Sequence, residues 1–223
     1  MQVRALSLWL AYTLRAPRRI EERLPSDLEL AALPLLQDET SRFPSPKLLF
    51  NAYEVDSPWM HGRRVETVVA ARHKGSKKTR LVVLDCISDT LRWDPVGGIQ
   101  RPNAYTRECK RGKGATYSID VRNTRDTFAV AGRLGKSRPV DWRFAVEGNR
   151  ECYYGGHDEA FPLTFNETQI ALPVQQVELT SVTNTLWRKA RTSTPSHAFV
   201  HPHSMEFHVD VDDFSGGPPQ QSR

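Results

Sequence analysis

Apolar and polar residues alternate at the start of the chain, which is the pattern of a half-buried β-strand. Ser7 and Thr13 fall between apolar residues that recur at every second position. The apolar series is Leu6, Leu8, Leu10, Tyr12 and Leu14. Arg15, Arg18 and Arg19 follow where a secretory signal would carry a cleavage site of small residues. The segment is therefore predicted to be a first strand and not a targeting peptide.

Strand patterns continue along almost the whole chain, bounded by turn-forming residues. The further candidate strands are Lys47–Tyr53, Arg64–Arg72, Thr79–Cys86, Ala115–Val121, Thr127–Arg133, Trp142–Glu147, Glu151–Tyr154, Gln169–Thr180 and His197–Val211. Helix signals are weak: Pro17 suits a first helical turn and Pro25 ends it, which leaves about two turns. Phe43–Pro46 and Trp187–Pro195 have the composition of loops. Many short strands joined by tight turns favour a mainly β fold, either a barrel or a sandwich.

The length of 223 residues suits one sizeable domain, which we predict over residues 1–214. The tail Ser215–Arg223 has no apolar side chain to bury, so it is predicted to be disordered. No apolar run approaches the roughly 18 residues of a membrane-spanning helix, so the chain is not expected to enter a membrane.

The net charge is +5, and basic residues gather around glycines in Arg72–Lys78 and Arg107–Lys113, as at the tips of hairpins. Nucleic-acid binding would need basic patches with aromatic side chains on one face. The aromatic residues lie inside the strand patterns instead, so nucleic acid is not expected as a partner. The three cysteines are widely spaced and odd in number, which favours reduced thiols in a cytoplasmic protein.

The stretch Trp93–Ala104 reads Trp-Asp-Pro-Val-Gly-Gly-Ile-Gln-Arg-Pro-Asn-Ala. It resembles the active-site turn of the acetoacetate decarboxylase-like superfamily, in which a glycine-containing turn leads into Pro-Lys-Lys. The first lysine of that motif forms a Schiff base with the substrate. In this chain Asn103 and Ala104 follow Pro102, so no amine stands at that position. The resemblance therefore implies a divergent member of the superfamily without the Schiff-base lysine.

Other segments resemble the family in the same order, over about residues 4 to 185. Tyr12–Leu30 is similar to the family's opening, in which a strand leads into a short helix and a Leu-Glu strand. Leu48–Asn51 resembles a strand that carries Phe-Glu, and Arg64–Glu66 falls where the family has a second glutamate. Thr79–Cys86 resembles the strand before the active-site turn, and Leu172–Leu179 resembles a late strand. The resemblance implies an antiparallel β-barrel with short helices, whose interior holds the site.

The resemblance also implies that the side chains of Asn51, Glu66 and Asn103 share one cavity. Asn51 replaces one family glutamate and Asn103 replaces the lysine. The two changes suit each other, because a buried carboxylate needs a compensating cation. Glu66 remains as the catalytic acid or base, and Glu66→Gln is expected to keep a similar thermal stability. Alternatively, Glu66 is an ordinary strand residue paired with Arg64 or Arg72.

Three further residues are candidates for substrate binding. Arg101 suits a carboxylate, because a guanidinium offers two parallel hydrogen bonds, and Gln100 precedes it in the turn. Arg4 lies near the position of an arginine that the family carries on its first strand, although a gapless alignment places Ser7 there. The direction of the Arg101 side chain stays open, because Pro102 interrupts the alternation.

A group of histidines near the C-terminus is a candidate metal site. In an extended strand His197, His201 and His203 share one face and would offer imidazoles to a metal ion. However, Pro202 interrupts the strand, and the spacing matches no zinc motif. We therefore expect no metal and, more generally, no cofactor.

Together these features favour a small-molecule enzyme of lyase or isomerase type. It would act on a keto or carboxylated metabolite through Glu66, without a lysine Schiff base. The alternative is a non-catalytic barrel that binds a small molecule, and the loss of both the lysine and a glutamate supports it. The sequence leaves open the substrate, the reaction and whether the chain forms a homo-oligomer.

Overall fold

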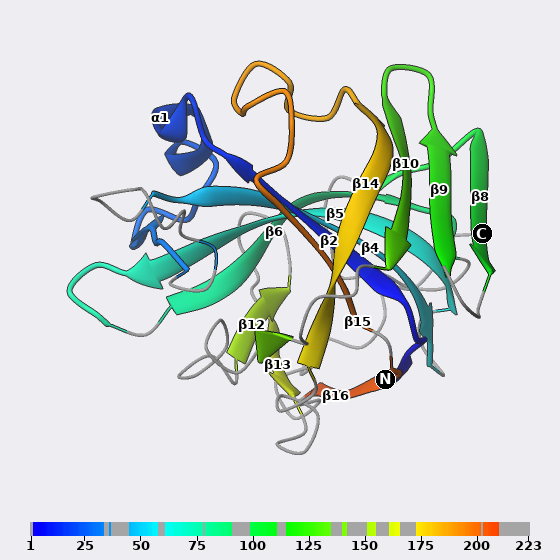
Figure 1. Ribbon diagram of the computed structural model, residues 1–223. Helices are drawn as coiled ribbons and strands as arrows, with labels where there is room; N and C mark the ends of the chain where they lie inside the picture. The colour runs from blue at the N-terminus through cyan, green and yellow to red at the C-terminus, as the bar shows by residue number, and fades with distance from the viewer. Residues whose placement is uncertain are drawn as a thin grey trace, which may run out of the picture.

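The computed structural model shows a sheet-rich molecule (Figure 1). The structure describes residues 2–33, 36, 45–57, 61–77, 79–90, 99–110, 115–134, 140–141, 151–154, 161–165, 173–201 and 203–209. The elements are β1 (Gln2–Val3), β2 (Ser7–Thr13), α1 (Pro17–Glu21), β3 (Leu28–Leu30), β4 (Lys47–Asp56), β5 (His61–His73), β6 (Thr79–Ser88), β7 (Ile99–Gln100), β8 (Ala104–Lys110), β9 (Thr116–Arg122), β10 (Thr127–Leu134), β11 (Val140–Asp141), β12 (Glu151–Tyr154), β13 (Phe161–Phe165), β14 (Pro173–Asn184), β15 (His197–His201) and β16 (Met205–Val209).

The sixteen described strands form one hydrogen-bonded sheet. Their order is β3-β5-β6-β12-β13-β16-β1-β4-β2-β15-β14-β10-β9-β8, with β11 beside β14 and β7 beside β6. Neighbouring strands run antiparallel except in the β6–β12 and β6–β7 pairs. The predicted mainly antiparallel β fold is therefore confirmed.

The expected closed barrel is not found, and this part of the prediction is corrected. Within the described residues, β3 and β8 each have a strand partner on one side alone, so the sheet ends at two open edges. The sheet nevertheless curls strongly. Strand β4, which pairs with β1 and β2, also pairs with β5, although β4 and β5 are far apart in the strand order.

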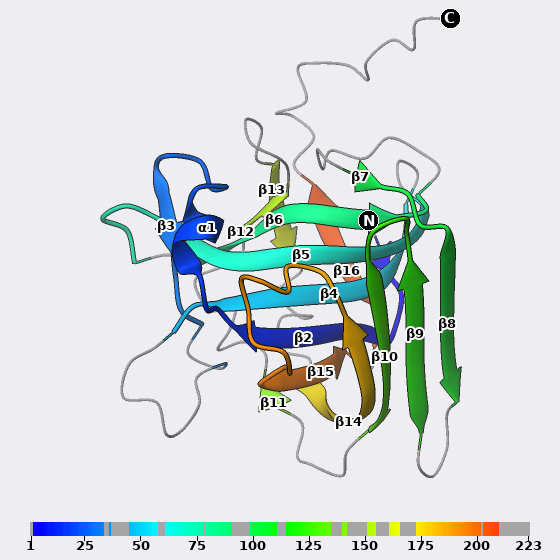
Figure 2. The ribbon, with the colours of Figure 1, turned by 90° about the horizontal axis from the view of Figure 1, so that it is seen from above.

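Strands β2, β4, β5 and β6 lie side by side at the centre of the molecule (Figure 2). One side of these strands, which we call the core face, carries Leu8, Leu10, Phe50 and Val65. It packs against the arm formed by β8, β9, β10 and β14, where the rings of Phe50 and Phe128 are 6.0 Å apart. This packing forms the hydrophobic core.

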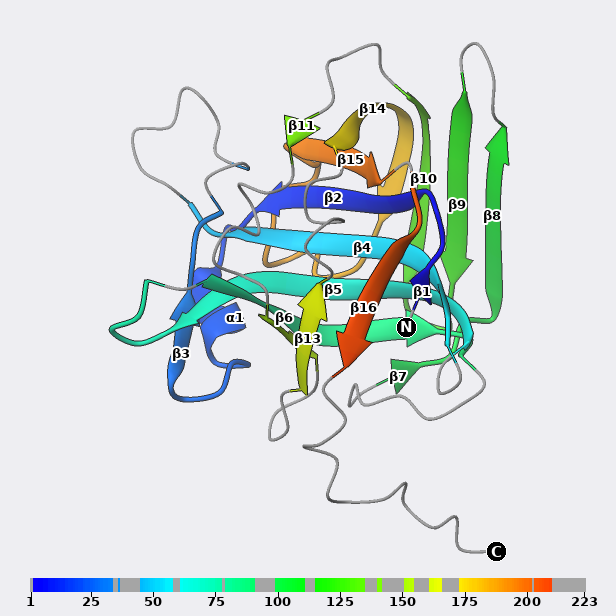
Figure 3. The ribbon, with the colours of Figure 1, turned by 90° about the horizontal axis from the view of Figure 1, so that it is seen from below.

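The opposite side of the central strands, which we call the site face, is buried as well. Every residue of Ser7–Tyr12 in β2, Lys47–Tyr53 in β4 and Arg64–Ala71 in β5 is buried, whichever way its side chain points. Strands β12, β13 and β16 lie across the central strands from the arm, and in Figure 3 β16 crosses in front of β4, β5 and β6 (Figures 1 and 3). Polar groups on this face therefore need hydrogen-bond partners within the protein.

Several strand predictions are confirmed. In β2, Leu8, Leu10 and Tyr12 lie in the core, as their alternation indicated. Gly75 lies in the turn between β5 and β6 and has a φ of +82°, a conformation that glycine adopts readily. The predicted hairpin tip within 72–78 is therefore confirmed. The predicted strand His197–Val211 is two strands, β15 and β16. Predicted strand 142–147 and the predicted disordered tail lie outside the described residues.

Strand β8 was missed, because its basic end was interpreted as part of a hairpin tip. Its outer residues are polar, and Arg107 stands among its inner residues. The Arg107 guanidinium donates to the backbone oxygens of Ala5 at 2.6 Å and Leu6 at 2.8 Å. These bonds let a cation occupy a position where the alternation would call for an apolar residue.

Helix α1 confirms the predicted short helix after the first strand. Pro17 begins it, and Ile20 is fully buried against the core. In the part of the chain that the structure describes, no helix has the length and apolar character needed to cross a membrane.

The segment after β14 folds back onto the central strands. Trp187 donates from Nε1 to Asp85 Oδ2 at 2.8 Å, and the Arg23 guanidinium lies 5.3 Å from the Trp187 ring centre. Burial raises the pKa of the Asp85 carboxyl above its usual value of 3.8. The charged carboxylate is therefore less favourable in the folded chain than in the unfolded chain.

Asp85→Asn is expected to raise the melting temperature at pH 7, because the amide still accepts the Trp187 hydrogen bond without a buried charge. Since the folded pKa of Asp85 is raised, wild-type stability falls as the pH rises from the unfolded pKa through the folded one. The advantage of the variant should therefore shrink as the pH is lowered toward 4. Thermal melts of both proteins across this range provide the measurement. Asp120→Asn is the matched control. Because Arg122 lowers the pKa of Asp120, this substitution should lower the melting temperature at pH 7 and not raise it.

Candidate functional site

The site face carries a row of five buried residues, one from each of five neighbouring strands. Phe199 lies opposite Trp9, and Trp9 lies opposite Asn51. Asn51 lies opposite Glu66, which lies opposite Cys86. Residues directly opposite each other in an antiparallel pair point to the same side of the sheet, so these side chains form a line. Each residue in the row is at most 8% exposed.

A second buried row runs beside the first. His201 lies opposite Ser7, Tyr53 opposite Arg64, and Arg64 opposite Ser88. The β2–β4 register, continued by one residue, places Ser7 opposite Tyr53. The two rows together gather hydroxyl, amide, imidazole, thiol, carboxylate and guanidinium groups on one buried face. We call these ten residues the buried polar site.

Glu66 lies at the centre of the buried polar site. Its Oε1 accepts hydrogen bonds from the Tyr53 hydroxyl at 2.6 Å and from Arg64 Nε at 3.0 Å. The side chains of Arg64 and Glu66 are 0% and 5% exposed, so this is a buried ion pair. Arg72 pairs instead with Glu29, at 2.7 Å. Glu66 thus pairs with Arg64, as the alternative of an ordinary strand residue had it. The pair is buried among other polar side chains.

Asn51 is held beside Glu66 by a hydroxyl group. Ser7 Oγ donates to Asn51 Oδ1 at 2.8 Å, and both residues are buried. The other polar atom of the amide, Nδ2, is a donor. The site therefore combines an amide donor with a carboxylate acceptor on adjacent strands.

Burial controls the protonation of the groups around Glu66. It raises the pKa of Tyr53 well above the usual value, and the neighbouring Glu66 charge raises it further. Burial also raises the pKa of the Cys86 thiol to about 12 and lowers the pKa of His201 to about 4. Near neutral pH the site therefore holds a protonated phenol, a neutral thiol and a neutral imidazole.

The histidine group does not form a metal centre among the described residues. His201 is buried on the site face, whereas His203 is exposed. No group of three histidine, cysteine, aspartate or glutamate side chains in the described ranges is placed to hold a metal ion.

The structure brings together two of the predicted site residues, Asn51 and Glu66, and it places Asn103 elsewhere. Asn103 is exposed at the start of β8, and its backbone N–H donates to the Arg122 oxygen at 2.7 Å. This bond ties Asn103 to the end of the β8–β9 hairpin. The prediction that all three side chains share one cavity is therefore corrected for Asn103.

The other predicted substrate-binding residues also lie outside the buried polar site. Gln100 Oε1 accepts from Asn123 at 2.8 Å, and the exposed Arg101 donates to the Thr90 oxygen at 2.7 Å. Arg4, half-exposed, pairs with acidic residues of β4 at 3.1 and 3.2 Å. Each side chain is drawn to a local partner that the alternation pattern does not reveal.

Sequence reasoning missed most of the polar groups that surround Glu66. Arg64 was considered as a pairing partner of Glu66 but not as a fully buried one, and Tyr53 was assigned to a strand without a role. Ser7 has a clearer signal, because the gapless alignment placed it at the family's arginine. Ser7 and Tyr53 both follow from the strand registers once the β2–β4–β5 order is known.

Lys47 is buried on the same face of β4 as Asn51. It is 2% exposed, and its Nζ donates to Thr13 Oγ1 at 2.9 Å. The other lysines in the described ranges are exposed. Among the lysines in the described ranges, Lys47 is therefore the candidate for covalent chemistry.

No protein-family model matches the chain, and no curated protein sequence matches it. Two solved structures of the enduracididine biosynthesis enzyme MppR are similar to it. One holds the condensation product of pyruvate and imidazole 4-carboxaldehyde, at 11% identity, and the other holds HEPES, at 12% identity. Both have a TM-score of 0.55 and cover 93% of this chain, with 88% and 86% of the MppR chain covered respectively.

The chain has the acetoacetate decarboxylase-like fold. An acetoacetate decarboxylase from Legionella pneumophila subsp. pneumophila str. Philadelphia 1 is also similar, with 14% identity, coverage of 94% of this chain and 88% of that chain, and a TM-score of 0.48. With the exception of the closed barrel, the fold that the sequence resemblance implied is confirmed. Within this acetoacetate decarboxylase-like fold, the buried polar site lies on the central strands.

Proposed function

We propose that the chain is an enzyme that transfers a proton on a keto or carboxylated small molecule, with Glu66 as the acid or base. The observation that carries the proposal is the contact of Glu66 with Tyr53 and Arg64 in a buried row of polar side chains. Removing two charges from water is costly, and apolar residues often stabilise a core as well as a buried ion pair does. The Arg64–Glu66 pair is therefore better explained by a role in function than by a contribution to stability.

The contacts of Glu66 suit proton transfer. Glu66 pairs with the Arg64 guanidinium as a hydrogen-bond acceptor, so it would act first as a base. Tyr53 is protonated and donates to the same oxygen, so it would return a proton or support charge that develops on a substrate oxygen. Catalysis of this type requires the base within hydrogen-bond reach of the substrate proton.

A keto or carboxylated ligand suits the donors of the buried polar site. The Arg64 guanidinium and the Asn51 amide can both donate to oxygen atoms. The pyruvate-derived product bound to MppR supports a ligand of this class. Of the residues predicted to bind substrate, Asn51 keeps that role in the proposal.

The proposed reaction does not use a lysine Schiff base, because Asn103 has no amine. Buried Lys47 offers the direct check on this point. Borohydride treatment of the protein with pyruvate should leave its mass unchanged. An adduct that maps to Lys47, and is lost in Lys47→Met, would instead indicate lysine chemistry.

A non-catalytic ligand-binding role is the second candidate. The same hydrogen bonds favour it, because a carboxylate already held by Arg64 and Tyr53 is typical of a stable polar network. In that case Glu66 would position donors for a ligand and would move no proton.

In a screen of keto acids and their esters with mass detection, turnover by Glu66→Gln is expected to fall by about 100-fold or more. Tyr53→Phe should also lower turnover, since it removes the hydroxyl and little else. Glu29→Gln, which breaks the Arg72–Glu29 pair away from the site, is the control and should keep wild-type turnover. All assays should run below the melting temperature of each variant. Full turnover in folded Glu66→Gln would remove Glu66 from the mechanism, whereas ligand binding without turnover would favour the binding role.

A further inference from the structure

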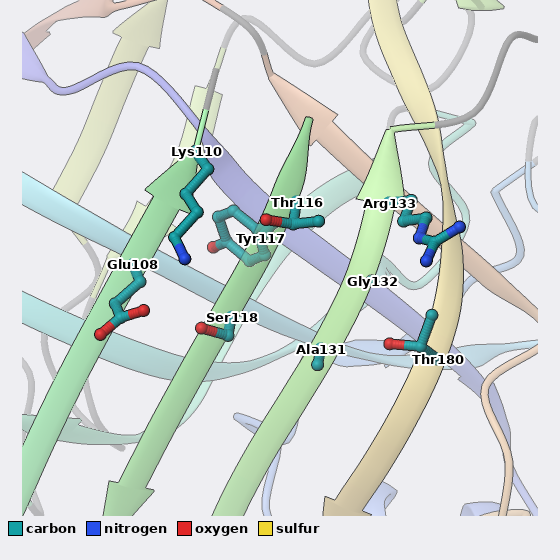
Figure 4. Close-up of a pocket in the computed structure, with 9 residues that line it drawn as sticks. All are labelled: Glu108, Lys110, Thr116, Tyr117, Ser118, Ala131, Gly132, Arg133 and Thr180. Atoms are coloured by element: carbon teal, nitrogen blue, oxygen red, sulfur yellow. The ribbon is translucent and has the colours of Figure 1, made fainter. Parts of the chain in front are cut away.

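The outer side of the arm, opposite the hydrophobic core, carries a shallow polar pocket of about 310 Å³ (Figure 4). It is lined by residues of β8, β9, β10 and β14. The pocket faces away from the core that the arm covers, so it is distinct from the buried polar site. The lining includes two cations, one carboxylate and four hydroxyl groups, of which three belong to serine and threonine and one to Tyr117.

The strand registers bring two cations to either side of one threonine. Lys110 lies opposite Thr116, and Thr116 lies opposite Arg133. Neighbouring strands are about 4.8 Å apart, so the two cationic residues are separated by two such steps. Lysine and arginine side chains are long enough to reach a group held over Thr116. The next row adds Ser118, a further hydroxyl donor.

A β-bulge creates room between these side chains. Ala131 lies opposite Ser181 and Gly132 opposite Leu179, so Thr180 has no direct partner on β10. A Cβ at Gly132 would lie 2.6 Å from the Val177 side chain, so the close approach of the strands at the bulge requires glycine. In Figure 4 the small Ala131 and the Gly132 backbone lie between Ser118 and Thr180. The bulge thus supplies both the depression and the Thr180 hydroxyl.

Among the residues that the structure describes, no acid neutralises the cations in the pocket. Neither Lys110 nor Arg133 forms an ion pair with a residue in the described ranges, although Glu108 and Glu178 lie near them in the sheet. By contrast, arginines such as Arg63 and Arg72 do pair with carboxylates. Lys110 and Arg133 thus remain available to an external anion.

We propose that this pocket binds the phosphate or carboxylate group of a small metabolite that carries an ammonium or hydroxyl group close by. Lys110 and Arg133 bind the oxyanion from two sides, and Thr116 and Ser118 donate to it from below. Glu108 lies two residues from Lys110 on the same side of β8, where it accepts a hydrogen bond from the neighbouring donor of the ligand. The Glu108 carboxylate therefore disfavours an anion that has no ammonium or hydroxyl group beside its oxyanion.

Titrations followed by backbone amide NMR test the proposal. The probes are phosphoethanolamine, ethyl phosphate, which lacks the ammonium group, and β-alanine, which replaces phosphate with carboxylate. Shifts are expected at Thr116, Ser118 and Ala131 with phosphoethanolamine, β-alanine or both, and the tighter of the two identifies the oxyanion. Ethyl phosphate should bind more weakly than phosphoethanolamine.

Lys110→Gln and Arg133→Gln should each lower the affinity by roughly tenfold or more, because each removes a charge-assisted hydrogen bond. Glu108→Gln should remove the preference for phosphoethanolamine over ethyl phosphate. Lys77→Gln and Arg125→Gln change the net charge equally at exposed sites elsewhere and should bind as the wild type does. All five substitutions are at exposed positions, so the folded state is retained and is checked by melting. Equal losses in the controls, or no shifts at the pocket with either bifunctional probe, would overturn the proposal.

Discussion

Glu66→Gln is expected to lower the free energy of unfolding by about 3 kcal/mol or more, because it leaves the Arg64 charge buried without its counter-ion. Arg64 is fully buried, and Glu66 Oε1 accepts from its Nε at 3.0 Å. This replaces the expectation of similar thermal stability drawn from the sequence, which treated the fit of glutamine as sufficient. Urea unfolding at pH 7 provides the measurement.

The double variant Arg64→Gln/Glu66→Gln separates the charge from the packing. With both charges removed, the loss should be smaller than the sum of the two single losses, because no uncompensated charge remains. Glu29→Gln, in a half-exposed pair with Arg72, should cost about 1 kcal/mol or less. A Glu66→Gln protein within about 0.5 kcal/mol of the wild type would show that the ion pair is not needed to compensate Arg64.

Arg191→Met is expected to lower the free energy of unfolding by about 3 kcal/mol or more, because buried oxygens lose their donors. Arg191 is 1% exposed and donates to the backbone oxygens of Asn184, Leu186 and Thr192. Its guanidinium also lies 4.0 Å from the centre of the Tyr12 ring. One side chain thus ties the segment after β14 to the core.

Arg188→Met is the matched control for this change, since Arg188 is an exposed arginine three residues earlier. It should change the stability by about 0.5 kcal/mol or less. The same urea unfolding experiment compares the two variants. Equal effects in both would indicate that loss of positive charge, and not loss of the buried hydrogen bonds, determines the result.

The sequence predicted the central strands well because their signal is local. Side chains alternate along a strand, so Leu8, Leu10 and Tyr12 had to share a side. Consecutive strands joined by a short turn also have a register that their spacing largely determines, which is why Asn51 and Glu66 meet across β4 and β5. The half of the site that lies on this hairpin was therefore accessible from the sequence through the family resemblance.

The tertiary structure alone decided what surrounds Glu66 and where Asn103 lies. Ser7 reaches Asn51 across 44 positions of the chain, and Asn103 is exposed at the start of β8, where Arg122 accepts its backbone N–H. Alternation gives each strand two sides, but it does not say which strand becomes its neighbour or what covers each side. Many pairings satisfy the same pattern, and the choice among them depends on contacts between distant segments. For that reason the full burial of Arg64, and with it the ion pair at the centre of the site, emerged only when the strands were packed together.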